Sequence, residues 1–223
     1  MVSSITKSPA PSRDRLLSAA AAEFAARGFD GATVDRIAAR ARVNKAMIYY
    51  HFRSKAGLYR EILLGLFAEV AASTEAVRSA GGTPDRQLRG FVEAIASGAV
   101  TRPHFPPIWL REMAEAGRHV DRAIVAEIGR VLAVLAAILR DGHREGIFRP
   151  ANPLVIQMGI VAPLLMFAAS GPVRAMVADQ VAMKGAATTP DAIVRHVQDT
   201  TLAGLARRTS SQGRQTASRR SKS

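Results

Sequence analysis

The stretch "TVDRIAARARVNKAMIYYHF", residues 33–52, gathers side chains that can bind a polyanion. Lys45, Tyr49, Tyr50 and His51 fall close together, although the chain holds only three tyrosines and is 5% aromatic. An ammonium group, two phenols and an imidazole can hydrogen-bond to base edges and phosphates, and the phenol rings also offer an apolar face. The stretch therefore indicates contact with duplex DNA, provided that these side chains point away from the core.

Two short helices separated by three residues are expected to position these groups. Thr33 can cap a helix that ends near Arg40, and Asn44 can cap the next helix. Ile48 and Phe52 lie four residues apart, so both should face the core from this second helix. Such a pair matches the helix-turn-helix, which lays its second helix in the major groove.

The outward face of the second helix would carry the contacts. Lys45 can reach a guanine edge or a phosphate, Ala46 allows close approach, and Tyr49 offers a hydroxyl and a ring face. Tyr50 and His51 project to the side, where phosphates would lie, although the tyrosines could instead be core aromatics and His51 a bystander on the surface. Thr33 and Lys55, at the starts of two helices, can hold the flanking DNA backbone with hydroxyl, ammonium and first-turn amide groups. The predicted DNA-binding residues are Thr33, Arg42, Asn44, Lys45, Ala46, Met47, Tyr49, Tyr50, His51 and Lys55.

The placement of charge agrees with one DNA-binding end. The net charge is +13, and residues 12–60 hold ten Lys or Arg against four Asp or Glu. Residues 61–205 hold fourteen of each sign, whereas 206–223 hold six basic residues and no acid. A neutral body with a basic head indicates that one end meets a polyanion. The basic tail could contact phosphates or could only keep the protein soluble.

Helical periodicity recurs along the whole chain and no stretch alternates long enough for a strand, so the predicted fold is all-α with about nine helices. A helix from Ser12 should end at Gly28 with a left-handed cap. The prolines of "TRPHFPP", residues 101–107, should stop another helix. A late helix should start near Pro153, kink at Pro163 and could continue further.

Composition limits the compartment and the chemistry. The chain has no cysteine and no N-terminal apolar run, which predicts a cytoplasmic protein. The apolar window 153–171 is slightly short of the ~20 residues that span a bilayer, so a buried helix is preferred and no membrane contact is expected. No metal and no cofactor are predicted, because four histidines lack metal-ligand spacing: His104, His119, His143 and His196. No catalytic motif is present either, which argues against an enzyme.

With these residues in view, the chain resembles the TetR family of transcriptional repressors. Two departures fall at the turn and at the start of the second helix, where Arg42 and Ala46 replace the glycines usual in the family. A left-handed backbone at Arg42 would cost about 1 kcal/mol. The resemblance is carried by Thr33, Ile37, Ala38, Val43, Asn44, Ile48, Tyr49, Tyr50, His51, Phe52 and Lys55.

The resemblance implies a homodimer that reads a palindromic operator and an effector pocket in the C-terminal domain. It also implies dimerisation through residues 153–170 and 190–207. The expected domains are a disordered N-terminal arm (1–11), a three-helix helix-turn-helix module (12–58), a larger helical domain for effector binding and dimerisation (59–207), and a disordered basic tail (208–223).

The predicted function is a repressor released from its operator by a small, mostly apolar effector. The alternative is a DNA-binding accessory factor or an activator without a small-molecule effector. Bulky inward residues are the candidates for a pocket lining, although each could equally belong to an ordinary packed core. The seven candidates are Phe91, Ile95, Trp109, Met113, Leu135, Met158 and Phe167.

Overall fold

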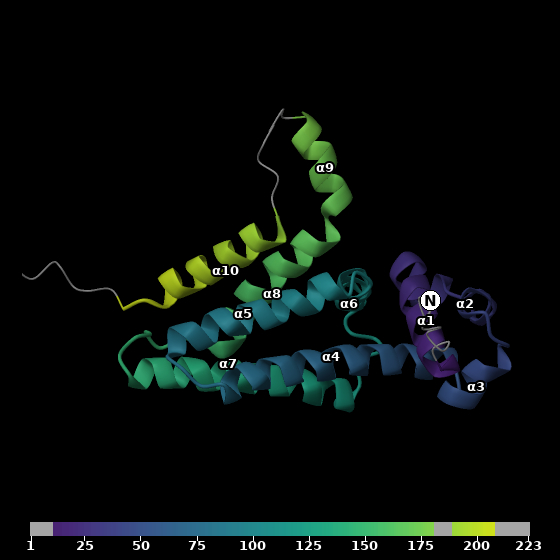
Figure 1. The fold of residues 1–223 in the computed structure, drawn as a ribbon, viewed down its shortest axis with the longest axis horizontal. Helices are drawn as coiled ribbons and strands as arrows, with labels where there is room; N and C mark the ends of the chain where they lie inside the picture. The colour runs from purple at the N-terminus through teal and green to yellow at the C-terminus, as the bar shows by residue number, and fades with distance from the viewer. Residues whose placement is uncertain (1–10, 181–188, 208–223) are drawn as a thin grey trace, which may run out of the picture.

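The computed structural model describes residues 11–180 and 189–207, and within them the chain is all-helical, apart from one isolated bridge (Figure 1). The predicted N-terminal arm and basic tail lie almost entirely outside these residues. The described part holds ten helices rather than about nine. They are α1 Ser12–Gly31, α2 Val34–Ala41, α3 Ala46–Phe52, α4 Lys55–Ser79, α5 Pro84–Thr101, α6 Phe105–Ala114, α7 Arg122–Arg144, α8 Pro153–Ala169, α9 Gly171–Gln180 and α10 Pro190–Leu205.

The extra helix arises because the apolar segment bends sharply after Ala169. Helix α8 runs through Pro163 without ending, and Ser170 then separates it from α9, with a bend of 74° between the two. Figure 1 shows α9 projecting away from the body. No described helix is long and apolar enough to cross a membrane alone, although α8 and α9 meet the criteria as a bent pair.

The proline-rich segment interrupts the helical structure over fewer residues than the predicted stretch 101–107. Only the three residues from Arg102 to His104 separate α5 from α6. Pro106 and Pro107 lie inside the first turn of α6. This placement is allowed because first-turn residues have no intrahelical acceptor for an N–H group, so proline loses no hydrogen bond there.

The helix-turn-helix module is α1–α3, and the long α4 connects it to the body (Figure 1). Leu16, Ile37 and Ile48 bring one buried side chain from each of the three helices to a shared core. The same cluster continues through α4 to Phe67 and to Ile108 of α6. The module is therefore packed onto the body rather than joined by a free linker.

The body is a bundle of α4, α5, α7, α8 and α10. Its core includes Phe91 and Leu135, both fully buried, together with Val197 from α10. Gly142 allows close packing here, since an added Cβ would lie 2.1 Å from Cδ2 of buried Phe148.

Backbone conformation explains two breaks in the module. Gly28 has φ 71° and ψ 178°, so it kinks α1, which continues to Gly31 instead of ending at Gly28 with the predicted left-handed cap. Arg42 has φ 54° and ψ 47°, so it adopts the left-handed conformation that the glycine of related sequences would adopt without a Cβ clash. The turn between α2 and α3 therefore has a left-handed residue although arginine stands in place of the glycine usual in the family.

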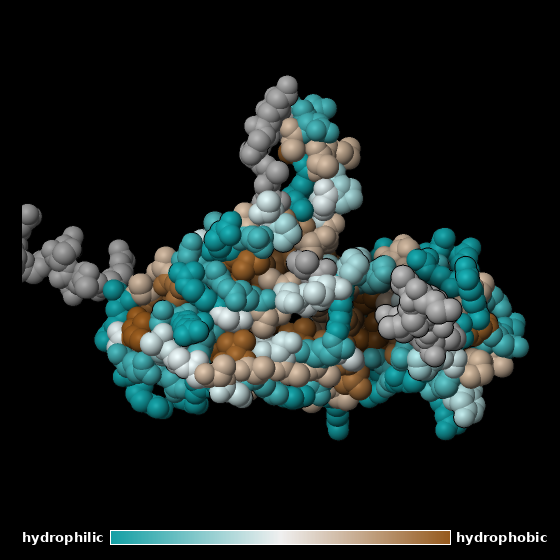
Figure 2. Space-filling model, in the orientation of Figure 1, coloured by the Kyte–Doolittle hydropathy of each residue, from teal (hydrophilic) through white to brown (hydrophobic). Residues whose placement is uncertain are grey.

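Helix α8 is not the buried helix that the sequence predicted. Ile160, Leu164 and Leu165 face the core, but a stripe of Leu154, Met158 and Met166 faces outward. In Figure 2 apolar side chains also lie at the surface of the projecting α9. An uncovered apolar face of this kind commonly marks an interaction surface.

Candidate nucleic-acid interface

Helix α3 turns its polar side outward, as the sequence predicted. Ile48 is 0% exposed and Phe52 is also buried. Tyr49 is 52% exposed and Tyr50 is 76% exposed, so neither is a core aromatic. The helix is thus anchored from behind, and its outer side is open to a ligand as large as a duplex.

Side-chain caps fix the ends of these short helices. Thr33 Oγ1 accepts a hydrogen bond from the Arg36 N–H at 3.3 Å. Asn44 Oδ1 accepts one from the Ala46 N–H at 2.8 Å. Ser54 caps α4 in the same way. Each cap stabilises a helix start by about 1 kcal/mol, which matters for helices of seven and eight residues.

Lys45 lies on the outer surface between α2 and α3. Its Nζ is 3.1 Å from Asp35 Oδ1, and both side chains are well exposed. An exposed pair of this kind contributes at most about 1 kcal/mol, so a phosphate could replace Asp35 at little cost. Ala46 and Arg42 are exposed beside it, and Met47 is partly buried against the module core.

His51 and Lys55 are partly buried, and both make hydrogen bonds within the module. His51 Nε2 lies 3.0 Å from Ser12 Oγ, which ties α3 to the start of α1. Lys55 Nζ donates to the carbonyls of Phe29 and Ala32 at 2.9 and 3.1 Å. It also lies 4.4 Å from the centre of the Phe29 ring. The expectation that the Lys55 ammonium holds a flanking phosphate is therefore corrected: this group fixes the connection between α1 and α2.

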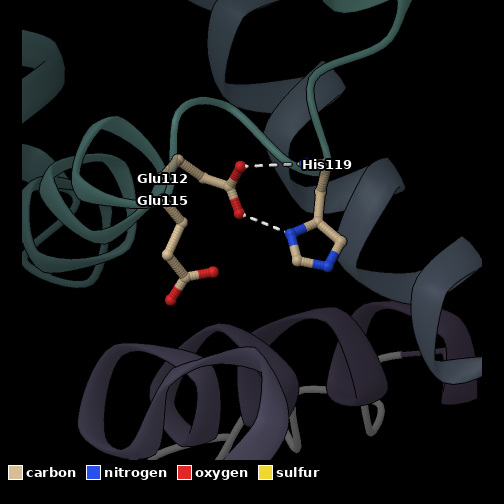
Figure 3. A group of neighbouring side chains, drawn as sticks. All are labelled: Glu112, Glu115 and His119. Atoms are coloured by element: carbon tan, nitrogen blue, oxygen red, sulfur yellow. Dashed lines mark hydrogen bonds and ion pairs between the residues drawn. The ribbon is translucent and has the colours of Figure 1, made fainter.

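A buried carboxylate that the sequence analysis missed holds α6 to α4 and to the segment before α7, and Figure 3 shows its contacts with His119. Glu112 of α6 is 1% exposed. Its Oε1 accepts from the Tyr59 hydroxyl at 2.8 Å and lies 2.7 Å from His119 Nδ1. Its Oε2 accepts from the His119 N–H at 3.1 Å. Burial and the bond to Glu112 raise the pKa of Tyr59 above its usual range, so the phenol stays protonated and donates.

The same group could be taken for a metal site. Ligand atoms of Glu112, Glu115 and His119 all lie within 4.8 Å of one another. However, both oxygens of Glu112 already have partners, and these hydrogen bonds account for its burial. The arrangement is better explained as a hydrogen-bond cluster that joins α6 to α4 and to the segment before α7, and we assign no metal to it.

Arg111, the residue before Glu112, extends the connection to α1. Its Nη1 donates to the Phe24 carbonyl at 3.0 Å, and it also bonds to the Ala25 carbonyl. These carbonyls precede the break at Gly28, where the helical hydrogen-bond pattern ends. Two adjacent residues of α6 therefore hold α1 and α4.

One cavity in the body is lined mainly by apolar side chains. It measures about 230 Å³ and lies among α5, α6, α8, α9 and α10. Its walls include small residues such as Ala96 and Ala99, and Phe167 is the one predicted candidate that lines it.

The other six candidates lie elsewhere, so their assignment to this cavity would be wrong. Phe91 and Leu135 are sealed in the core, whereas Met113 and Met158 are exposed. Ile95 and Trp109 pack against the two core clusters, and Trp109 also packs edge-on against Phe67. Inward periodicity thus located four packed residues and two exposed methionines, not the lining of the cavity.

A capped pair of short helices with an outward recognition face defines the class: helix-turn-helix DNA-binding regulators. The family described as bacterial regulatory proteins, tetR family, matches residues 16–62. The repressor NicS of Pseudomonas putida is 32% identical over 139 residues, covering 61% of this chain and 66% of NicS. The repressor SCO4008 of Streptomyces coelicolor is 30% identical over 147 residues, covering 66% of this chain and 72% of SCO4008.

Solved structures agree with this fold along most of the chain. A tetR-family regulator from Rhodococcus RHA1 superposes with a TM-score of 0.73 at 18% identity, covering 89% of this chain and 98% of that one. PfmR from Thermus thermophilus has a TM-score of 0.69 at 24% identity, with 89% and 100% covered. The chain belongs to the TetR family, and it is a DNA-binding transcriptional regulator rather than an enzyme.

Tyr49→Ala is expected to weaken binding to the operator by about 1–3 kcal/mol, because it removes an exposed group from the outer face of α3. Fluorescence anisotropy with a labelled operator measures the loss, and an unchanged melting temperature shows that the fold is intact. Tyr49→Phe separates the hydroxyl from the ring. Wild-type affinity of the Ala variant would show that this face does not meet the bases.

Tyr59→Phe is expected to lower the free energy of unfolding by about 1–3 kcal/mol, because the buried Glu112 carboxylate loses a donor. Tyr50→Phe is the matched control, since its hydroxyl lies on an exposed residue, and should change stability by less than about 0.5 kcal/mol. Urea denaturation at one fixed protein concentration compares them. Equal stability of the two variants would contradict the role given to the cluster.

Proposed function

We propose that this protein is a transcriptional repressor in the cytoplasm that binds a palindromic operator as a homodimer and is released by a small-molecule effector. The observation that carries the proposal is the orientation of α3, with Tyr49 outward and Ile48 sealed behind it. Both relatives described above are named as repressors, which supports this direction of regulation.

The dimer proposal rests on the uncovered face of α8. Leu154, Met158, Ala162 and Met166 recur every four residues and form one exposed stripe along this helix. A two-fold axis would place the stripe against its own copy and remove both from water. The same axis would relate two α3 helices, and the two helices could then enter successive major grooves.

The effector proposal rests on α6. Pro106 lines the cavity near the start of this helix, and Arg111 and Glu112 hold α1 and α4 further along it. A ligand in the cavity that favours another position of α6 would therefore alter the placement of the module. The population of dimers whose two α3 helices are wrongly spaced for successive major grooves would then rise, and operator binding would fall.

An activator or accessory factor without an effector is the second candidate function. It shares the DNA-binding face but needs no cavity. Melting temperatures in the presence of small ligands separate the two, since a ligand that binds the folded state raises the melting temperature.

Selection of bound fragments from genomic DNA tests the proposed function directly. We expect a two-fold symmetric sequence, with half-sites about one helical turn apart or a multiple of it, because each protomer offers one α3. A reporter gene downstream of that sequence then gives the sign of regulation. A single asymmetric site would count against a dimer with two α3 helices, and reporter activation would reject repression.

Val155→Glu is expected to convert the dimer to monomers, because it places a charge in each half of an apolar interface, at a residue that is 65% exposed in one chain. Val125→Glu is the matched control, as this valine is 55% exposed and belongs to α7 and not to the α8 stripe. Sedimentation velocity at micromolar concentration measures both. If the Val155→Glu variant remained dimeric, the dimer interface would have to lie on another surface.

A further inference from the structure

The cavity in the body combines apolar walls with one charged side chain. Leu164 of α8 and Ile193 and Val194 of α10 form part of the walls, and Ala96 and Ala99 of α5 leave the space open. Arg174 of α9 is the charged residue in this lining. Such a lining suits a molecule with an apolar body and a single polar end.

The Arg174 guanidinium is positioned but not neutralised. It lies over the Phe167 ring at 3.7 Å from the ring centre, and its Nη1 donates to Ser170 Oγ at 2.8 Å and to the Phe167 carbonyl. Within the described chain its hydrogen bonds use Nη1, and it forms no ion pair. All eighteen Asp and Glu residues belong to the described ranges, so no acidic side chain outside them could neutralise it.

We propose that this cavity binds a small amphipathic carboxylate, with its apolar body between α5, α8 and α10 and its carboxylate on Arg174. Arginine is suited to this task because its planar N–H groups match the two oxygens of a carboxylate. A volume of about 230 Å³ is below the ~300–1,000 Å³ of sites for drug-sized ligands. A short fatty acid or a single-ring aromatic acid is therefore the appropriate class.

This inference rests on the proposed function, because it names the chemical class of the effector. It also adds a charge to the mostly apolar effector expected from the sequence. The simpler role for Arg174 is to cap α8, since it bonds to the carbonyl of Phe167 near the end of that helix. A capping role alone would affect stability but would not make the cavity prefer an acid over its neutral amide.

The test compares acids with their primary amides on the full-length protein. The probes are hexanoate, octanoate, benzoate and phenylacetate, each beside the corresponding amide, and calorimetry and thermal shift measure binding. We expect at least one acid to bind at least tenfold more tightly than its amide. Arg174→Gln should remove that preference. Arg195→Gln, on an exposed position of α10 that does not line the cavity, should retain it.

Three results would overturn the inference: no acid binds, an amide binds as tightly as its acid, or Arg174→Gln keeps the preference. Operator binding is measured in parallel on the same samples. If an acid binds but does not release the operator, the carboxylate site is supported and its role as the effector site is rejected. If only an amide releases the operator, the proposal that the effector is a carboxylate is rejected.

Discussion

The buried carboxylate of Glu112 constrains how α6 fits against α4 and the segment before α7. A charged group that is 1% exposed must be held by donors, and here they come from Tyr59 of α4 and from His119 before α7. Moving α6 away would leave this charge without partners in a place that water does not reach. The helix next to the DNA-binding module therefore has a well-defined position, which its neighbour Arg111 fixes further against α1.

This constraint bears on how the proposed effector signal would reach the module. One core cluster extends from Ile37 in α2 to Ile108 in α6, so the packing is continuous across the predicted domain boundary at residue 58. A signal from the cavity need not cross a flexible linker. Pro106 and Glu112 lie on the same short helix, and a rigid helix transmits a displacement from one end to the other.

Local signals allowed the recognition module to be predicted from sequence. Caps act within three residues and the stripe of Ile48 and Phe52 repeats within one turn, so no distant partner is needed to identify them. Lys55 was misjudged because the carbonyls that hold it lie 26 and 23 positions earlier. Glu112 was missed for the same reason, since Tyr59 is 53 positions away. The cavity was missed because bulky residues mark filled space, whereas alanines such as Ala96 leave it open.

The same reasoning applies to α8 and α9. An apolar helix in the sequence is expected to be buried, and α8 buries only one face within a single chain. Its outer stripe would be costly in water, so a second copy is the natural cover. Arg174 stands on α9 directly after this helix, and α9 carries exposed Val173 and Met176. One projecting helix thus both supplies the charge of the cavity and carries exposed apolar side chains, which would link occupancy of the cavity to the geometry of the proposed dimer.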